Sequence, residues 1–244
     1  MILADVDALF IDDGDVLNDN NIRGPHFRRL VAKFFSPRLG GSREAWEEAN
    51  RTVADTFLPQ IFTAGFNPDD YAGWWGEYQI EWLKRMAVIV GAALPDSDNK
   101  CLGLASEAID YITLRVRSGY PGAVEAIHNL RGMGYRLFTA SGEHSRELEG
   151  YLRGMGIRQY FDVLYGPDLV NKGKYSVEYY RRVFDHAGIT PERALVVDDK
   201  PRYLAWVSSL GAKTCLIGSS RHDAEVDLAV PTMADLPSLL RKGS

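Results

Sequence analysis

Short apolar runs alternate with segments of helical periodicity through the second half of this chain, and this alternation constrains the fold more than any other feature. Apolar runs lie at 135–141, 161–166, 193–199 and 212–218, with helical patterns at 145–156, 176–188 and 202–211 between them. Strands separated by helices in this way form a parallel sheet through right-handed crossovers. The segment LFID at 9–12 resembles a strand buried on both faces, so we expect it in the same sheet.

The segment between this first strand and the alternating region has a different texture. Residues from about 20 to 118 show helical periodicity and no convincing strand. Gly24 and Pro25 are expected to open a first helix, with the proline in its first turn. Ser42, Asp70 and the segment 95–99 are placed to start three later helices, the last running to about Arg117. We therefore predict a doubly wound, Rossmann-like α/β core at 1–18 and 119–244, interrupted by an all-helical cap domain at 19–118.

Composition narrows the class of protein further. The chain has 244 residues, is 45% hydrophobic and carries a formal net charge of -5 without an extended basic run, which argues against a nucleic-acid partner. It contains no apolar run of the roughly 18 residues that a membrane span needs. The acidic N-terminus does not resemble a signal peptide, and Cys101 and Cys215 lie far apart. These features predict a cytoplasmic protein with two reduced thiols and no membrane partner.

Polar residues follow the predicted strands at the edge where ligands bind to an open parallel sheet. Asp12 ends the first strand, Ser141 ends the run at 135–141, and Asp198 and Asp199 end the run at 193–199. Lys174 precedes the helical segment at 176–188. A carboxylate attacks a phosphate monoester only when the repulsion between the two anions is neutralised, which a divalent cation such as Mg²⁺ and an ammonium group can do. A hydroxyl and neighbouring N–H groups can then hold a phosphoryl oxygen.

Four motifs in this order resemble those of the haloacid dehalogenase (HAD) superfamily. ALFIDDGDVL at 8–17 resembles its first motif, D-x-D-G-[TV]-L after an apolar strand, and GYRLFTASG at 134–142 resembles the second. KYSVEYY at 174–180 and ALVVDDKPRYLAWVSSLGAKT at 194–214 resemble the third and fourth. The segment 120–137 resembles the helix that precedes the second motif in the subclass with a helical cap.

The resemblance implies a role for each of these residues. Asp12 would attack the phosphoryl group and form an aspartyl-phosphate that water then hydrolyses. Asp12, the backbone carbonyl of Gly14 and Asp199 would coordinate Mg²⁺, with Asp198 supporting through water. In addition, Ser141 and Gly142 would bind the phosphoryl group, and Lys174 would offset the charge on Asp12 and on the phosphate. The expected substrate is a small phosphorylated molecule.

The first motif departs from the family pattern at one position. Gly14 stands where similar phosphatases carry the second aspartate, which transfers protons to the leaving group and from water. With Asp12 as nucleophile, Asp15 or a cap residue would supply the proton, or the reaction would be slow. General acid–base help contributes on the order of 10²–10⁴ in rate, so its loss weakens catalysis without abolishing it. A register shifted by one residue would instead pair Asp13 with Asp15.

Other assignments have competing candidates. Thr139 competes with Ser141 as the phosphoryl-binding hydroxyl, and Lys172 competes with Lys174. The cap aromatics are either the core of the cap or the lining of a substrate pocket; they are Trp46, Phe57, Phe62, Trp74, Trp75, Tyr78 and Trp82.

Three functions are therefore compared. The sequence favours a Mg²⁺-dependent phosphatase over a 2-haloacid dehalogenase that uses Asp12 without a metal, because Asp198 and Asp199 beside Asp12 repel one another unless a cation is bound. A HAD-fold binding module with little turnover is the third possibility, suggested by Gly14. The substrate and the oligomeric state cannot be predicted from these residues.

Overall fold

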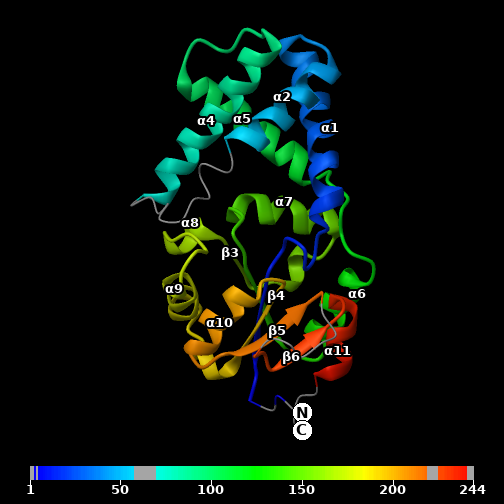
Figure 1. The fold of residues 1–244 in the computed structure, drawn as a ribbon, viewed down its shortest axis with the longest axis vertical. Coiled ribbons are helices and arrows are strands. Elements are labelled where there is room, and N and C mark those ends of the chain that lie inside the picture. Colours follow the sequence, from blue (N-terminus) through cyan, green and yellow to red (C-terminus); the bar gives the residue numbers. More distant parts are fainter. Residues whose placement is uncertain (1–2, 4, 58–69, 219–224, 241–244) are drawn as a thin grey trace. The chain divides into compact units, whose positions relative to one another are not determined.

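A computed structural model describes Leu3 and residues 5–57, 70–218 and 225–240 of the chain. The chain divides into two compact units (Figure 1). The core unit comprises Met1–Asn20 and Ser118–Ser244, and the helical unit comprises Asn21–Arg117. The helical unit is thus inserted into the core after its first strand.

The core is built on a six-stranded sheet with the order β3-β2-β1-β4-β5-β6. Every neighbouring pair of strands is parallel. The strands are β1 (Ala8–Ile11), β2 (Arg136–Ala140), β3 (Val163–Tyr165), β4 (Ala194–Asp198), β5 (Lys213–Ile217) and β6 (Leu228–Val230). The sequence predicts the first five of these, whereas the short β6 has no clear signal and was missed.

Strand β1 lies at the centre of the sheet, between β2 and β4. Ile11 is paired with Thr139 on one side and with Val197 on the other. The order of the strands reverses at this point: β2 and β3 extend the sheet on one side of β1, and β4, β5 and β6 extend it on the other. Ligands bind to doubly wound sheets at such a switch point, beyond the carboxyl ends of the strands.

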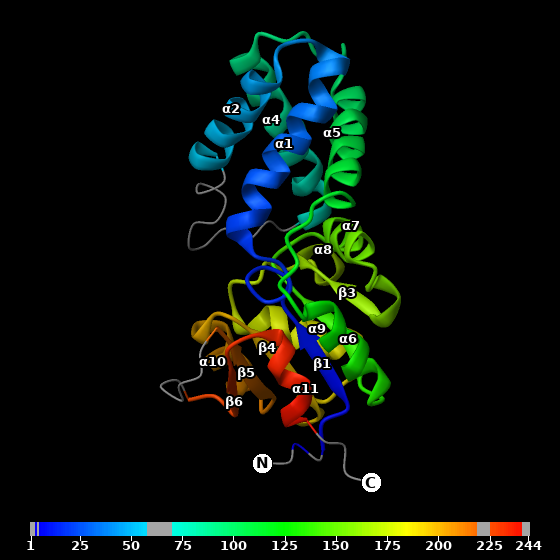
Figure 2. The same cartoon turned by 90° about the vertical axis from the view of Figure 1, so that its right-hand side faces the viewer.

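Helices cover both faces of this sheet, and the alternation of side chains along β1 explains why the strand is apolar throughout. Leu9 and Ile11 pack in one buried cluster, while Ala8 and Phe10 pack in another. The first cluster includes residues of α6 (Ala123–Gly132), α7 (Ser145–Met155) and α11 (Leu236–Leu239). The second includes residues of α8 (Pro167–Val170), α9 (Val177–Ala187) and α10 (Pro201–Ser209) (Figure 2).

In its described part, the helical unit contains helices and no strand. The helices are α1 (Asn20–Leu39), α2 (Arg43–Thr56), α4 (Tyr71–Val90) and α5 (Asp98–Thr113). As predicted, Ser42 caps α2 by accepting a hydrogen bond from the N–H of Ala45, and Asp70 caps α4 by accepting one from Gly73. None of the described helices is long and apolar enough to cross a membrane.

Two helix limits differ from the sequence prediction. Helix α1 begins at Asn20, so Pro25 lies inside the helix and not in its first turn. The earlier start is supported by Asp15, whose carboxylate accepts hydrogen bonds from the backbone N–H and the side-chain amide of Asn20. Helix α5 ends at Thr113, before the predicted limit at about Arg117.

Aromatic side chains of the helical unit fall into a buried and a half-buried group. Trp46 is fully buried and stacks on Phe35 with ring centroids 5.0 Å apart, and Trp82 is also buried. Trp46 and Trp82 therefore belong to the core of the unit, which is the first of the two interpretations given above for the cap aromatics. Phe57, Trp74, Trp75 and Tyr78 are half-buried and stack on one another. Phe62 lies outside the described residues.

Candidate active site

Asp12 directly follows β1, where the backbone still pairs with the neighbouring strand. Its N–H donates to the carbonyl of Val197 at 2.9 Å, so the residue is held at the strand end. Only 8% of its surface is exposed. A carboxylate is costly at such a position unless a cation or hydrogen-bond donors compensate its charge.

Lys174 supplies that compensation from a separate part of the chain. Its Nζ lies 3.1 Å from Oδ1 of Asp12 and 2.7 Å from Oδ2 of Asp198, and the residue is buried. Burial alone would lower the pKa of Lys174, but Asp12 and Asp198 overcome this effect and raise it, so the side chain is a permanent cation. The ammonium group also lies 5.1 Å from the centre of the Tyr203 ring.

The two aspartates after β4 differ in their surroundings. Oδ2 of fully buried Asp198 accepts from Lys174, and its Oδ1 accepts from the backbone N–H of Lys200 at 2.8 Å. Burial raises the pKa of Asp198 to about 6. Asp199 is more exposed and pairs with the ammonium group of Lys200. Burial raises the pKa of Asp199 as well.

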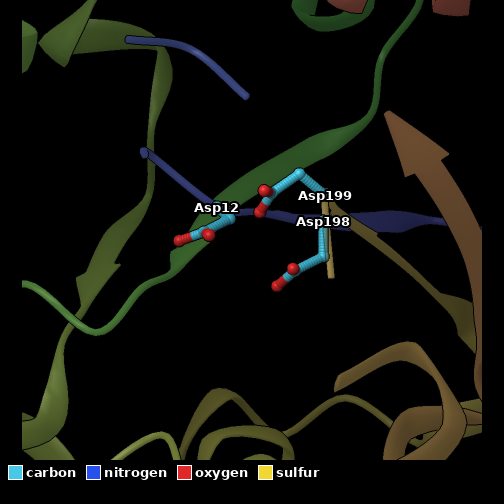
Figure 3. Close-up of side chains that lie close together, drawn as sticks. All are labelled: Asp12, Asp198 and Asp199. Carbon is cyan, nitrogen blue, oxygen red and sulfur yellow. The ribbon is translucent and has the colours of Figure 1, made fainter. Parts of the chain in front are cut away.

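Asp12, Asp198 and Asp199 together form an acidic cluster (Figure 3). Each offers one carboxylate oxygen, and these oxygens all lie within 4.8 Å of one another. Among the described residues this is the group of acidic, histidine or cysteine side chains with the spacing to hold a metal ion. Oxygen donors of this kind suit hard divalent cations.

Asp13 has a different environment from Asp12. It is fully buried, and its Oδ1 accepts a hydrogen bond of 2.7 Å from the amide of Asn18. Oδ1 of Asn18 in turn accepts from the hydroxyl of Ser118, so this carboxylate belongs to a buried hydrogen-bond network within the core unit. The ion pair with Lys174 is made by Asp12, which favours the unshifted register of the first motif.

The loop between Asp13 and Asn18 is tightly folded. The carbonyl of Asp13 accepts from the N–H groups of Leu17 and Asn18 at 2.9 Å each, and the N–H of Asp15 donates to the carbonyl of Asn18 at 2.7 Å. Asp15 has a φ of 58°, in the left-handed region that few residues other than glycine, asparagine and aspartate adopt. Its carboxylate binds Asn20 and lies 4.0 Å from Nζ of Lys200, whereas Gly14 is half-buried in the same loop.

Ser141 and Thr139, the two hydroxyl candidates, differ in what their hydroxyl groups do. The Thr139 hydroxyl donates to the carbonyl of Tyr165 at 3.1 Å, so it stabilises the contact between β2 and β3. The Ser141 hydroxyl accepts from the N–H of Glu143 at 3.3 Å, which leaves its proton available for a ligand oxygen. Gly142, the next residue, is exposed and has open space where a Cβ would lie. These contacts favour Ser141 over Thr139.

Lysine 174, and not Lys172, contacts the acidic cluster. Lys172 is half-buried, and its backbone N–H donates to the carbonyl of Pro167 at 3.0 Å near the end of α8. Of the two lysines, the one in phase with the third motif is therefore the one that contacts Asp12 and Asp198.

Three residues that sequence reasoning missed brace the loop after Ser141. Tyr179 donates from its hydroxyl to the carbonyl of Ser141 at 2.9 Å. Asp168 accepts from the backbone N–H of Ser145 at 2.8 Å and also from its hydroxyl. A Cβ at Gly166 would lie 2.2 Å from the carbonyl oxygen of Glu143. The glycine after β3 was visible in the sequence, but nothing there indicated which loop approaches it.

The parallel sheet thus brings a strand-end aspartate, a buried lysine and an acidic pair together at its switch point. The family model of haloacid dehalogenase-like hydrolases matches residues 8–202. The chain belongs to this family and is a hydrolase.

Curated relatives and solved structures agree with this assignment. The phosphorylated carbohydrates phosphatase of Thermotoga maritima is 30% identical over 91 residues, which are 37% of this chain and 42% of that protein. The curated relatives that match carry the names of phosphatases or of a putative pyrophosphatase, and this chain spans less than half of their length.

The structural neighbours cover nearly the whole chain. A HAD phosphatase from Thermococcus onnurineus has a TM-score of 0.62 at 18% identity, covering 96% of this chain and 97% of that one. The defluorinating L-2-haloacid dehalogenase Rha0230 has a TM-score of 0.65 at 16% identity, covering 96% and 94%. At these identities the neighbours establish the fold and do not distinguish between the two activities.

Proposed function

We propose that this chain is a Mg²⁺-dependent phosphatase that hydrolyses a small phosphorylated metabolite through an aspartyl-phosphate on Asp12. The observation that carries the proposal is the position of the Lys174 ammonium group, 3.1 Å from Asp12 and 2.7 Å from Asp198, with Asp199 in the same cluster. This arrangement provides a nucleophile, a fixed cation and a set of oxygen donors at one strand edge.

The acidic cluster fits a divalent cation on charge and chemistry. Asp12, Asp198 and Asp199 bring three carboxylates together, and Lys174 neutralises one of them within the buried part of the site. Asp12, Asp199 and the carbonyl of Gly14 would hold the ion, with Asp198 behind them through water. A bound Mg²⁺ would withdraw charge from the phosphoryl oxygens and so lower the repulsion toward the nucleophile.

The residues of the chain then have defined tasks in two steps. An oxygen of Asp12 attacks phosphorus and the bond to the leaving oxygen breaks, which leaves the phosphoryl group on the carboxylate. Lys174 holds Asp12 in place and stabilises the charge on the phosphoryl oxygens, while the Ser141 hydroxyl and the N–H of Gly142 hold a non-bridging oxygen. Water attacks the same phosphorus in the second step, which releases phosphate and restores Asp12.

Proton transfer cannot follow the usual family pattern, because Gly14 stands in place of the second aspartate. Asp13 and Asp15 flank the position that Gly14 fills, but Asp13 is buried and binds Asn18, and the oxygens of Asp15 bind Asn20 at the start of α1. We therefore propose that Asp15 holds this loop against the start of α1. The leaving group would then take its proton from water or from a residue of the helical unit. This assignment predicts a slow enzyme for substrates with a basic leaving group.

A 2-haloacid dehalogenase is the second candidate, because solved dehalogenases share the fold and halide leaves without a proton. The phosphatase is better supported, since Asp198 and Asp199 beside Asp12 are costly in a site that binds no cation. The phosphatase names among the curated relatives point the same way.

The test is a panel of small phosphomonoesters and 2-haloacids, assayed for released phosphate and halide with Mg²⁺ and with EDTA. We expect phosphate release that requires Mg²⁺ and is lost in Asp12→Asn. Halide release that survives chelation would establish the dehalogenase instead. Phosphate binding without turnover on any ester would support a binding module.

A further inference from the structure

Tyr179 contacts the candidate site through the backbone of Ser141. The residue is fully buried in the first turn of α9, in the segment that Lys174 precedes. Its hydroxyl donates to the carbonyl of Ser141 at 2.9 Å and lies 3.3 Å from the carbonyl of Tyr165. One phenol therefore connects the ends of β2 and β3 with the helix that follows the lysine.

With this contact, both backbone polar groups of Ser141 form hydrogen bonds. The N–H of Ser141 donates to the carbonyl of Tyr165 at 3.1 Å, and its carbonyl accepts from Tyr179. The carbonyl of Tyr165 also accepts from the hydroxyl of Thr139 at 3.1 Å, so it has donors whether or not the phenol is present. The carbonyl of buried Ser141 depends far more on Tyr179, and a buried carbonyl that loses its donor is costly.

Resting on the proposed function, we propose that Tyr179 is a positioning residue, which fixes the Ser141 hydroxyl at the distance from the Lys174 ammonium that a phosphoryl group requires. Ser141 and Lys174 would hold oxygens of the same phosphoryl group, yet they belong to different segments of the chain. Tyr179 follows Lys174 in the same segment, and its phenol binds the Ser141 carbonyl, so it connects the segment of the lysine with the serine. Burial raises the pKa of Tyr179 well above its usual value, although Lys174 acts in the opposite sense, so the hydroxyl keeps its proton.

The test compares Tyr179→Phe with the wild type in the full chain with Mg²⁺. A hydrogen bond of this kind supports a fold-change of about 3 to 10, so we expect KM for a phosphomonoester and the inhibition constant of inorganic phosphate to rise by that factor. The value of kcat should change less, because the link serves substrate and transition state alike. Tyr135→Phe is the matched control, since Tyr135 is equally buried but belongs to the cluster on the other face of the sheet.

A double-mutant cycle separates positioning from general support of the fold. In a Ser141→Ala background, Tyr179→Phe should change the inhibition constant of phosphate by less than about twofold, because the hydroxyl that it positions is absent. Hydrogen exchange of the peptide covering 139–145 should be faster in Tyr179→Phe and unchanged in Tyr135→Phe.

The possible outcomes distinguish this inference from the function on which it rests. Equal effects of Tyr179→Phe in both backgrounds, or no effect in either, would overturn the inference and leave the phosphatase intact. A wild type that neither hydrolyses phosphomonoesters nor binds phosphate would overturn both.

Discussion

The core and the helical unit bury different kinds of polar group. Among the described residues, every buried charged side chain belongs to the core: Asp12, Asp13, Glu147, Lys174 and Asp198. The buried polar residues of the helical unit are neutral: Asn50, Gln79 and Thr113. Gln79 accepts from Ser106, and the hydroxyl of Thr113 donates within its own helix, so these groups are satisfied locally.

The comparison indicates that the two regions bury their side chains for different reasons. A buried ion pair contributes little to stability compared with apolar packing of the same volume. We therefore attribute the buried charges of Asp12, Lys174 and Asp198 to the proposed chemistry, whereas packing explains the stacked aromatics of the helical unit. Substitutions in the two regions should accordingly affect different measurements.

The largest effect is expected at Asp12, the proposed nucleophile. Asp12→Asn should lower kcat/KM for a phosphomonoester by about 10³-fold or more, because the amide cannot form the phosphoryl intermediate. The melting temperature should change by no more than about 4 °C, since Lys174 keeps its hydrogen bond to Asp198. Steady-state kinetics and thermal denaturation measure both quantities. A large loss of stability with little loss of rate would reverse the assignment.

The corresponding substitution in the helical unit is Trp46→Ala. Removal of this buried indole, which stacks on Phe35 and donates to the carbonyl of Gly40 at 2.8 Å, should destabilise the protein by about 3–5 kcal/mol. Urea denaturation followed by circular dichroism measures the loss. The exposed Val88 on α4 provides the control, because Val88→Ala should stay within about 0.5 kcal/mol. Similar losses for the two variants would contradict the packing argument.

A smaller effect, on both stability and KM, is expected for Gly166→Ala. In Gly166→Ala the new Cβ would meet the carbonyl of Glu143 at 2.2 Å, so the loop after Ser141 must shift. We expect a loss of about 1–3 kcal/mol in unfolding free energy. KM should also rise, because this loop follows Ser141 and Gly142, the proposed phosphoryl-binding residues.

Gly132→Ala in α6 is the matched control for this loop. It has open space around the added carbon and should gain up to about 1 kcal/mol from helix propensity. A Gly166→Ala protein that is as stable and as active as the control would show that the close approach to Glu143 is unimportant.

The smallest effect is expected at Asp15. Asparagine tolerates the left-handed backbone and can still accept from the N–H of Asn20, so Asp15→Asn should preserve the loop. We expect kcat to fall less than about tenfold, below the 10²–10⁴ typical of a general acid. The pH profile of kcat should keep its shape. A larger fall, or the loss of one limb of the profile, would identify Asp15 as the proton donor.

Much of the core could be predicted from the sequence because its signals are local. The apolar runs at β1, β2 and β4 are buried on both faces, and Gly156 and Gly188 end their helices with the left-handed backbone that glycine favours. The strand β6 was missed because three residues carry too little periodicity. The start of α1 was misplaced because its stabilising contact comes from Asp15, outside the helix.

The candidate site was predicted less completely, because several of its contacts join segments that are distant in the sequence. Asp12 and Asp198 lie at strand ends, so topology indicates that they meet, and the third motif indicates that Lys174 joins them. The loop after Ser141 contacts Tyr179, Asp168 and Gly166, which belong to segments that share no local pattern with it. Which of Thr139 and Ser141 offers its hydroxyl also depended on a contact with the neighbouring strand, at the carbonyl of Tyr165.

The most direct test of the central claim is to look for the phosphoryl group on Asp12. Acid quenching during turnover of a phosphomonoester with Mg²⁺, followed by peptide mass spectrometry, should show one added phosphoryl group on the peptide that contains Asp12. The adduct should be absent from Asp12→Asn and from reactions with EDTA. Turnover with the phosphoryl group on another residue, or an organic adduct on Asp12 from a 2-haloacid, would contradict the account.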